Sequence, residues 1–330
     1  MTITQAIDIM RSGTREEKWR VCGNIVRKCF IGYPMNIAWI IRICWNYTRY
    51  VTYEKKSTEI TYDVWVSQFK KRFGKTPPVH NTEFAARENL GLMAQFTRHN
   101  ELDSFPLPGG YSLVLPPVAN ARDTAVNDLR EILVEKIYEH NSVDLRQNDV
   151  VIDCGANIGL FSLMAFHRIG NQGRLIAIEP VPSIRAVLER NLSQADGQTF
   201  YHIFDRPVFS DSRAMTLSVD EDVFTMHHLD MGPSPASKGP GIKVQTTTID
   251  ELIKELGLTR VDFIKMDIEG AEMGALAGAA STLKQWKPRL AISAYHLIDD
   301  FYQIPRLIHK LNPSYHIYVS RGRSPMCYAW

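Results

Sequence analysis

The sequence predicts an α/β protein with a mostly parallel, Rossmann-like sheet that has helices on both faces. From residue 149 onward, short apolar runs alternate with amphipathic stretches of helical length, which is the pattern of repeated strand–helix units. A chain of 330 residues is also long enough to bury a full core. The part before this alternation has helical periodicity. We therefore expect a mainly helical region over residues 1–100 and a Rossmann-like domain over residues 101–330.

The amino-terminal region is basic. Residues 1–75 hold 14 Lys and Arg against 6 Asp and Glu, whereas the rest holds 24 against 30. A basic surface suits an anionic partner or a membrane surface, and a solvated helical face is the alternative. Residues 29–41 are free of charge, but a spanning helix needs about 20 apolar residues. We expect a buried helix there, with a membrane-surface anchor as the alternative.

A helix over residues 36–51 would carry one polar stripe, because Arg42, Asn46 and Arg49 recur at helical spacing. Such a helix packs against the main domain or against a second copy, so a homodimer through these helices is one expectation. The five cysteines include no C-x-x-C pair, which indicates neither a disulfide framework nor a zinc site. Free thiols and the absence of a recognisable signal peptide suit a cytoplasmic protein.

The elements follow in order. Before residue 149 we expect a helix over 82–99, a hairpin over 105–117 around a Gly-Gly turn, and a helix over 119–140. The predicted strands cover 150–153, 174–178, 199–204, 214–219, 243–247, 261–266 and 290–294. The predicted helices cover 160–168, 182–193, 249–256, 271–283 and 304–311. Residues 231–241 are rich in Pro, Gly and Ser and predict a surface loop.

The turn after the first of these strands, in the stretch DVVIDCGANIG over 149–159, indicates what the domain binds. The dinucleotide fingerprint fails, because Asn157 and Leu160 stand where its later glycines belong. A phosphate loop fails as well, because no Lys follows Gly159. Glu179 ends the next strand and can accept hydrogen bonds from both ribose hydroxyls. Asp153 suits a cationic group, so S-adenosyl-L-methionine fits the turn.

Four motifs carry a resemblance to a known family. VIDCGANIGLFSL, AIEPVPSIRAVLERN, TTTIDEL and FIKMDIEGAE occur in this order, and the chain over about 119–319 resembles the FkbM-type S-adenosylmethionine-dependent methyltransferases. The resemblance implies a class I methyltransferase fold. It places the cofactor on Asp153, Gly155, Ala156, Asn157, Gly159 and Glu179. Arg-Pro-Val at 206–208 departs from the usual pattern, so the adenine contact stays unassigned.

Methyl transfer from a sulfonium is an in-line displacement, and a hydroxyl or amide acceptor must also lose its proton. We expect Asp267 or His296 to act as the base, since each follows a predicted strand beside the cofactor turn. Glu269 and Glu272 match the family motif. A structural alternative makes them helix-start acids with Lys265 as their ion-pair partner, and we prefer it for Glu272.

The acceptor pocket is expected to involve His227, His228, Glu269 and Tyr295. Asp267, Glu269 and Asp299 or Asp300 could cluster around Mg²⁺, but nothing in their spacing demands a metal, and none is predicted.

The expected reaction is methyl transfer to a hydroxyl oxygen of a natural product or a sugar. The alternative acceptor is a peptide side-chain amide, with the basic amino-terminal region docking the peptide. A non-catalytic binding protein is disfavoured by the intact cofactor motifs. A nucleic-acid enzyme is disfavoured because Asp267 is followed by Ile268 and not by Pro-Pro, and because the expected catalytic domain over 101–330 is acidic. The expected partner is therefore a small molecule or a peptide, and no nucleic acid.

Overall fold

The computed structural model describes residues 92–99, 102–118, 121–195, 197, 199–219, 228–229, 241–297, 299–320 and 324–330. The predictions for residues 1–91, including the helix over 36–51 and its role in dimerisation, lie outside these ranges. So does the loop over 231–240. Asn89–Ala294 and Gln303–Trp330 form one compact unit, and this unit contains the sheet and the cofactor turn.

A seven-stranded sheet forms the centre of this unit, in the order β12-β13-β11-β10-β4-β5-β6. The five strands from β11 to β6 are parallel, and β13 is antiparallel to both of its neighbours. The strands are β4 (Val150–Cys154), β5 (Arg174–Ile178), β6 (Phe200–Phe204), β10 (Phe263–Met266), β11 (Arg289–Ser293), β12 (Ile317–Val319) and β13 (Met326–Ala329). All residues of β4 and β10 are buried, as expected for central strands covered on both faces.

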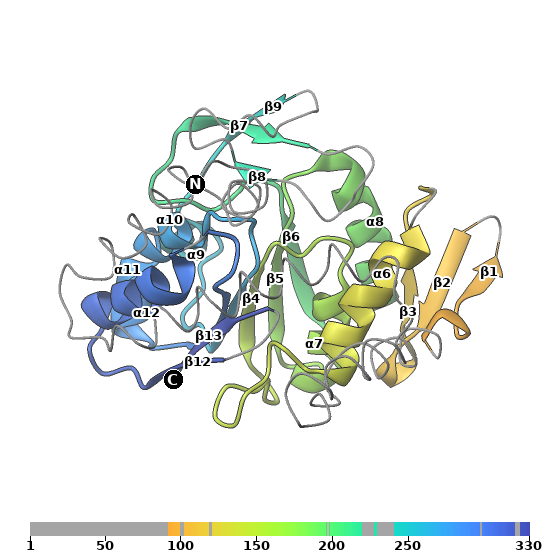
Figure 1. Ribbon diagram of the computed structural model, residues 1–330, viewed down its shortest axis with the longest axis horizontal. Helices are drawn as coiled ribbons and strands as arrows, with labels where there is room; N and C mark the ends of the chain where they lie inside the picture. The colour runs from red at the N-terminus through yellow and green to blue at the C-terminus, as the bar shows by residue number, and fades with distance from the viewer. Residues whose placement is uncertain are drawn as a thin grey trace, which may run out of the picture. The chain divides into compact units, whose positions relative to one another are not determined.

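Helices cover both faces of the sheet (Figure 1). On one face lie α6 (Ala121–Leu129), α7 (Leu160–Ile169) and α8 (Pro182–Leu192). On the other lie α9 (Ile249–Glu255), α10 (Glu272–Ala277), α11 (Ala280–Gln285) and α12 (Asp300–Leu311). The apolar residues of the sheet pack against α9 to α12 in a single buried cluster. The expected Rossmann-like, mostly parallel sheet with helices on both faces is confirmed.

Two small antiparallel sheets flank this core. The first joins β1 (Thr97–His99), β2 (Leu102–Pro106) and β3 (Ser112–Val114), and a 3₁₀ turn, η1 (Pro108–Gly110), connects the last two. It confirms the predicted hairpin. The second joins β7 (Ala214–Ser218), β8 (His228–Leu229) and β9 (Gly241–Gln245). The strands predicted at 214–219 and 243–247 therefore exist, but they pair with each other outside the parallel sheet. The 3₁₀ turn η3 (Ser193–Ala195) extends α8.

Three helix predictions were wrong, two at their carboxyl ends and one in the middle. The helix expected over 82–99 gives way to strand β1, because residues 97–99 pair with β2. The helix expected over 119–140 ends in a π-helical turn, η2 (Arg130–Val134), so Tyr138 lies beyond it. The helix expected over 271–283 is two helices. The first ends at Ala277 and the second begins at Ala280; Gly278 between them lies so close to Phe209 that a side chain there would collide with the Phe209 backbone carbonyl.

Candidate functional site

The site lies where the order of the strands reverses. From β4 the chain builds outward through β5 and β6, and it then returns to add β10 and β11 on the other side of β4. Cys154 at the end of β4 and Met266 at the end of β10 are directly paired. The loops that follow these two strands therefore meet at one edge of the sheet, the place where ligands bind in open α/β folds.

Gly155 lets these two loops touch. It has a φ of 78°, and a side chain at this position would collide with the backbone carbonyl of Asp267. Its amide and that of Ala156 both donate to the carbonyl of Ile178 at the end of β5, at 3.1 and 2.9 Å. Only glycine meets both the backbone conformation and the space. The first half of the predicted cofactor turn is thus fastened between β5 and β10.

The second half of the turn leads into α7. Asn157 has a φ of 50°, a left-handed conformation that asparagine tolerates better than most residues, and its Oδ1 accepts a hydrogen bond from the Ile158 amide at 2.6 Å. Gly159 has a φ of 93° and precedes the first residue of α7. A Cβ there would lie 2.8 Å from Cδ1 of Leu188, so this glycine lets α7 approach α8 closely.

Glu179 follows β5 and faces the same turn. Its Oε2 accepts a hydrogen bond from the Asn157 amide at 3.0 Å, and its Oε1 accepts one from the Val181 amide at 2.9 Å. The side chain is buried, and burial raises its pKa to about 7 against the two hydrogen bonds, which lower it. The structure therefore places the predicted ribose-binding acid against the backbone of the glycine turn.

Asp153 and Lys265 form an ion pair beneath the turn. The Lys265 Nζ lies 3.0 Å from Asp153 Oδ1, and Asp153 Oδ2 accepts a hydrogen bond from the Ser162 hydroxyl at 2.7 Å. Asp153 is 0% exposed and Lys265 is 4% exposed. The suggestion that Lys265 pairs with Glu269 and Glu272 was wrong, because β10 and β4 lie side by side and bring Lys265 directly opposite Asp153. Direct contact of Asp153 with a cofactor stays a prediction.

Asp267 begins the loop after β10 and is partly exposed. Its Oδ2 accepts a hydrogen bond from the Tyr138 hydroxyl at 2.5 Å. This contact joins residues that are 129 positions apart and orients the carboxylate. Glu272 is the first residue of α10, and its Oε1 accepts a hydrogen bond from the Ile268 amide at 2.8 Å. The structural interpretation of Glu272 as a helix-start acid is confirmed.

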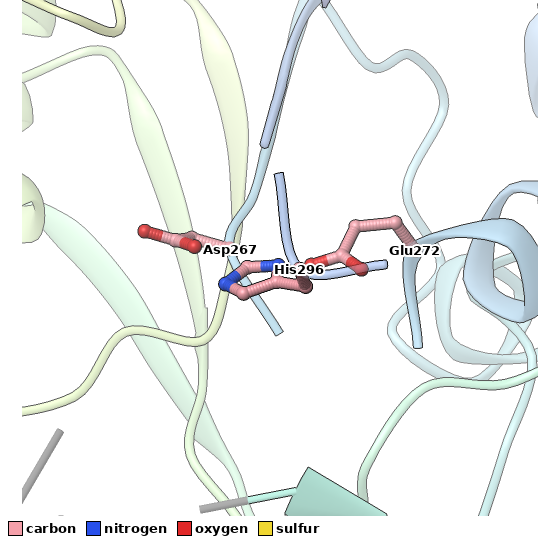
Figure 2. Close-up of side chains that lie close together, drawn as sticks. All are labelled: Asp267, Glu272 and His296. Atoms are coloured by element: carbon pink, nitrogen blue, oxygen red, sulfur yellow. The ribbon is translucent and has the colours of Figure 1, made fainter. Parts of the chain in front are cut away.

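Asp267, Glu272 and His296 lie close together (Figure 2). One carboxylate oxygen of Asp267, one of Glu272 and one imidazole nitrogen of His296 lie within 4.8 Å of one another. Carboxylate oxygens and imidazole nitrogens are common ligands of divalent metal ions. One oxygen of each carboxylate already accepts a hydrogen bond from the protein. The expectation that no metal binds here stays a prediction, as does the role of His296 as the base. Asp299 and Asp300 are not part of this group.

The remaining predicted residues are placed as follows. Glu269 is partly exposed and has a φ of 54°, an unfavourable conformation that clusters at functional sites. The Tyr295 ring lies 4.4 Å from the His296 ring, centre to centre. His227 lies outside the described residues, and only the backbone of His228 is described, in β8. Their place in an acceptor pocket stays a prediction.

Two acids that sequence reasoning missed belong to the same neighbourhood. Burial raises the pKa of Asp128 in α6 to about 8, and the negative charges of Glu131, Asp267 and Glu269 raise it further. Burial also raises the pKa of Glu131. A carboxyl group that holds its proton near neutral pH, as Asp128 does, is typical of functional sites. Asp128 lies in α6 and Glu131 in the π-helical turn η2, and the residues beside them carry no motif that identifies either acid.

Comparisons with known proteins agree with the motifs. A family model described as the methyltransferase FkbM domain matches residues 153–315. The AMB antimetabolite synthetase AmbE of Pseudomonas aeruginosa is 29% identical over 180 residues, which are 45% of this chain and 8% of that protein. The 31-O-demethyl-FK506 methyltransferase FkbM of Streptomyces tacrolimicus is 27% identical over 201 residues, covering 52% of this chain and 74% of that protein.

One further curated protein and one solved structure are also methyltransferases by name. The 2-O-methyltransferase NoeI of Sinorhizobium fredii is 28% identical over 185 residues, covering 52% of this chain and 74% of that protein. A crystal structure of methyltransferase FkbM from Methylobacillus flagellatus covers 82% of this chain and 62% of that one, with 19% identity and a TM-score of 0.44; no inference rests on that likeness. The chain spans 8% and 66% of the first two curated relatives that it matches. Among the described residues, no helix combines the length and apolarity that crossing a membrane requires.

Proposed function

Because residues 153–315 belong to the FkbM methyltransferase family, we propose that this chain transfers the methyl group of S-adenosyl-L-methionine to a hydroxyl oxygen of a small natural product or a sugar. The names of two relatives specify oxygen as their acceptor, FkbM of Streptomyces tacrolimicus and NoeI of Sinorhizobium fredii. These names describe those proteins. They support oxygen as the first acceptor to test here.

The cofactor assignment is supported by the turn between β4 and α7. Two glycines with positive φ keep the backbone free of side chains, and the buried Glu179 lies against the Asn157 amide at the end of the neighbouring strand. A nucleoside bound along this edge would offer its ribose hydroxyls to the Glu179 carboxylate. No Lys or Arg stands within the turn to recognise a phosphate, so a cofactor without phosphates is favoured.

The observation that carries the proposal is the position of Asp267. Its backbone touches Gly155 of the cofactor turn, and its carboxylate is held by the Tyr138 hydroxyl at 2.5 Å. A carboxylate beside the methyl donor can accept the proton that a hydroxyl loses as its oxygen attacks. In this proposal Asp267 is the base and the cofactor turn holds the methyl group in line.

The test is an acceptor screen with purified protein, S-adenosyl-L-methionine, and matched sets of hydroxylated metabolites, sugars and amide-bearing peptides. Addition of one methyl group, located on oxygen by tandem mass spectrometry, supports the proposal. Methylation confined to a peptide amide refutes it and establishes the alternative acceptor.

The variant Asp267→Asn tests whether Asp267 is the base, and Asp262→Asn is its matched control. Asp267 follows the carboxyl end of β10, whereas Asp262 precedes its amino end and accepts a hydrogen bond from the Val150 amide. We expect Asp267→Asn to lower kcat by about 100-fold or more while cofactor affinity changes less than about threefold. Asp262→Asn should change neither. Full turnover in Asp267→Asn would exclude Asp267 as the base.

A further inference from the structure

The buried ammonium of Lys265 touches more than its partner carboxylate. Its Nζ donates to the carbonyl oxygen of Gly155 at 2.7 Å and to that of Cys154 at 3.3 Å, besides its contact with Asp153 Oδ1 at 3.0 Å. Both hydrogen bonds go to backbone carbonyls, one of Cys154 at the end of β4 and one of Gly155 in the cofactor turn, whereas the contact with Asp153 is an ion pair.

The walls around this ammonium suit a fixed cation. Its Nζ lies 5.3 Å from the centre of the Tyr138 ring and 5.9 Å from that of Phe161, distances at which an aromatic face attracts a cation. Burial opposes the charge on Lys265, but the carboxylates of Asp153 and Asp267 outweigh it and raise its pKa. Lys265 is therefore charged in the folded protein, and the negative charge of Asp153 compensates its positive charge.

The turn needs such a support because of its glycine. Gly155 can adopt many backbone conformations, so the peptide group between Gly155 and Ala156 is free to rotate unless both of its sides are held. The Ala156 amide is held by the Ile178 carbonyl of β5 at 2.9 Å, and the Gly155 carbonyl is held by Lys265 of β10. Lys265 thus completes a two-sided attachment of this one peptide group.

We propose that Lys265 is a positioning residue for the cofactor, and that its ammonium fixes the orientation of the Gly155–Ala156 peptide in the turn. The inference rests on the proposed function, because that function makes the turn a cofactor site. Asp153 then acts indirectly, by compensating the charge of Lys265. Its burial from solvent and its bond to the Ser162 hydroxyl agree with that role.

The test separates charge compensation from positioning. Replacing both partners of a buried ion pair by residues of similar size leaves no charge unpaired, whereas replacing one partner does. The double variant Asp153→Asn/Lys265→Met therefore removes the positioning ammonium without leaving a buried charge. The matched control is Asp149→Asn/Arg289→Met. In that pair Asp149 is buried and Arg289 mostly buried, with 2.7 Å between Arg289 Nη2 and Asp149 Oδ1, but it lies at the amino ends of β4 and β11, opposite the site.

Two quantities are measured on each protein: the affinity for S-adenosyl-L-methionine by calorimetry, and the hydrogen-exchange rate of the Ala156 amide without cofactor. For Asp153→Asn/Lys265→Met we expect about tenfold or weaker binding, because bonds from a charged donor are lost, and Ala156 exchange at least about tenfold faster. The control should leave both quantities within about threefold of wild type. Wild-type affinity and exchange in the folded double variant would overturn the proposal.

Asp153→Asn alone is the second variant, and it decides the matter if the double variant does not fold. The single change leaves the buried charge of Lys265 uncompensated, so if Asp153 acts only through Lys265, any loss of affinity in this variant should be accompanied by faster Ala156 exchange. A folded Asp153→Asn protein with slow Ala156 exchange and binding weakened by tenfold or more would overturn the proposal, because Asp153 would then contact the cofactor itself. If the wild-type protein binds no S-adenosyl-L-methionine, the proposed cofactor is refuted. The comparison of Ala156 exchange rates between wild type and the double variant would then still show whether Lys265 fixes the turn.

Discussion

Replacing Glu179 with Gln tests the cofactor site through its dependence on pH. The folded protein raises the pKa of Glu179 from 4.5 to about 7, mainly by burial. Ribose hydroxyls donate hydrogen bonds, so they favour the ionised carboxylate. Cofactor affinity should therefore rise as Glu179 loses its proton. With a pKa of about 7, the ionised fraction is roughly one in eleven at pH 6 and ten in eleven at pH 8, so affinity should differ about tenfold between these pH values.

The assay is calorimetric titration of wild type and Glu179→Gln with S-adenosyl-L-methionine at several pH values from 6 to 8. Any titration of the ligand itself is common to both proteins, so the difference between them isolates Glu179. At pH 8 the variant should bind more weakly by about 1–3 kcal/mol, the range for losing a charged hydrogen-bond acceptor. Equal affinities at pH 8, or parallel pH dependences in the two proteins, would show that Glu179 does not bind the cofactor.

The same pKa shift sets a stability difference with a definite sign. A carboxyl group whose folded pKa lies above its unfolded value stabilises the fold fully below pH 4.5, and this stabilisation is lost as pH rises through about 7. For a shift of this size the loss is about 3 kcal/mol. Wild type should lose this amount between pH 4.5 and 8 relative to Glu179→Gln, measured by urea unfolding. Matching curves would contradict the burial argument.

Four further predictions follow from the same neighbourhood. Gly155→Ala should abolish cofactor binding and destabilise the fold by about 2 kcal/mol or more, measured by urea unfolding, because its φ is 78° and a side chain would collide with the Asp267 carbonyl; wild-type stability would refute the geometry. Tyr138→Phe should lower kcat several-fold with unchanged cofactor affinity, since it removes the hydrogen bond to Asp267; an unchanged kcat would show that this bond does not orient the base. Asp128→Asn should lose less stability than wild type between pH 4 and pH 9, by roughly 6 kcal/mol, because the pKa of the wild-type carboxyl is raised from 3.8 to about 8 and the stabilisation is lost as pH rises through that value; equal changes of the two proteins in urea unfolding between pH 5 and pH 9 would count against this. EDTA should not change turnover, because Asp267 and Glu272 already accept hydrogen bonds from the protein; a loss that Mg²⁺ restores would establish a metal site.

The parallel sheet and the cofactor turn could be predicted from the sequence because their signals are local. Strand β5 begins and ends as its apolar run predicts, and α7 and α8 end within one residue of their predicted limits. The glycines of the turn could also be predicted to mark it, because the short connection between a strand and a helix requires a positive φ at these positions. Glu179 could be placed because the second strand of such a fold ends beside the first turn.

The rest could not be predicted, because it depends on residues that are distant in sequence. Helical periodicity continues across the break between α10 and α11, and the close approach of the Phe209 carbonyl to Gly278 at that break joins distant parts of the chain. Tyr138 reaches Asp267 over 129 positions, and nothing near Tyr138 indicates that contact. The strands β12 and β13 carry weak local signals and acquire their places by pairing beside β11.

By itself, the sequence determined the class of the fold, the glycine turn after β4 and the acids near the ends of its strands. Each of these is encoded by neighbouring residues, through periodicity and backbone conformation. Only the tertiary structure decided what the acids do. It buries Asp153 against Lys265, sets Glu179 against the turn, and leaves Asp267 partly exposed with the Tyr138 hydroxyl on its carboxylate. The physical reason is that burial and charge partners control a carboxyl group, and both are set by strand order and loop contact over long distances in the chain.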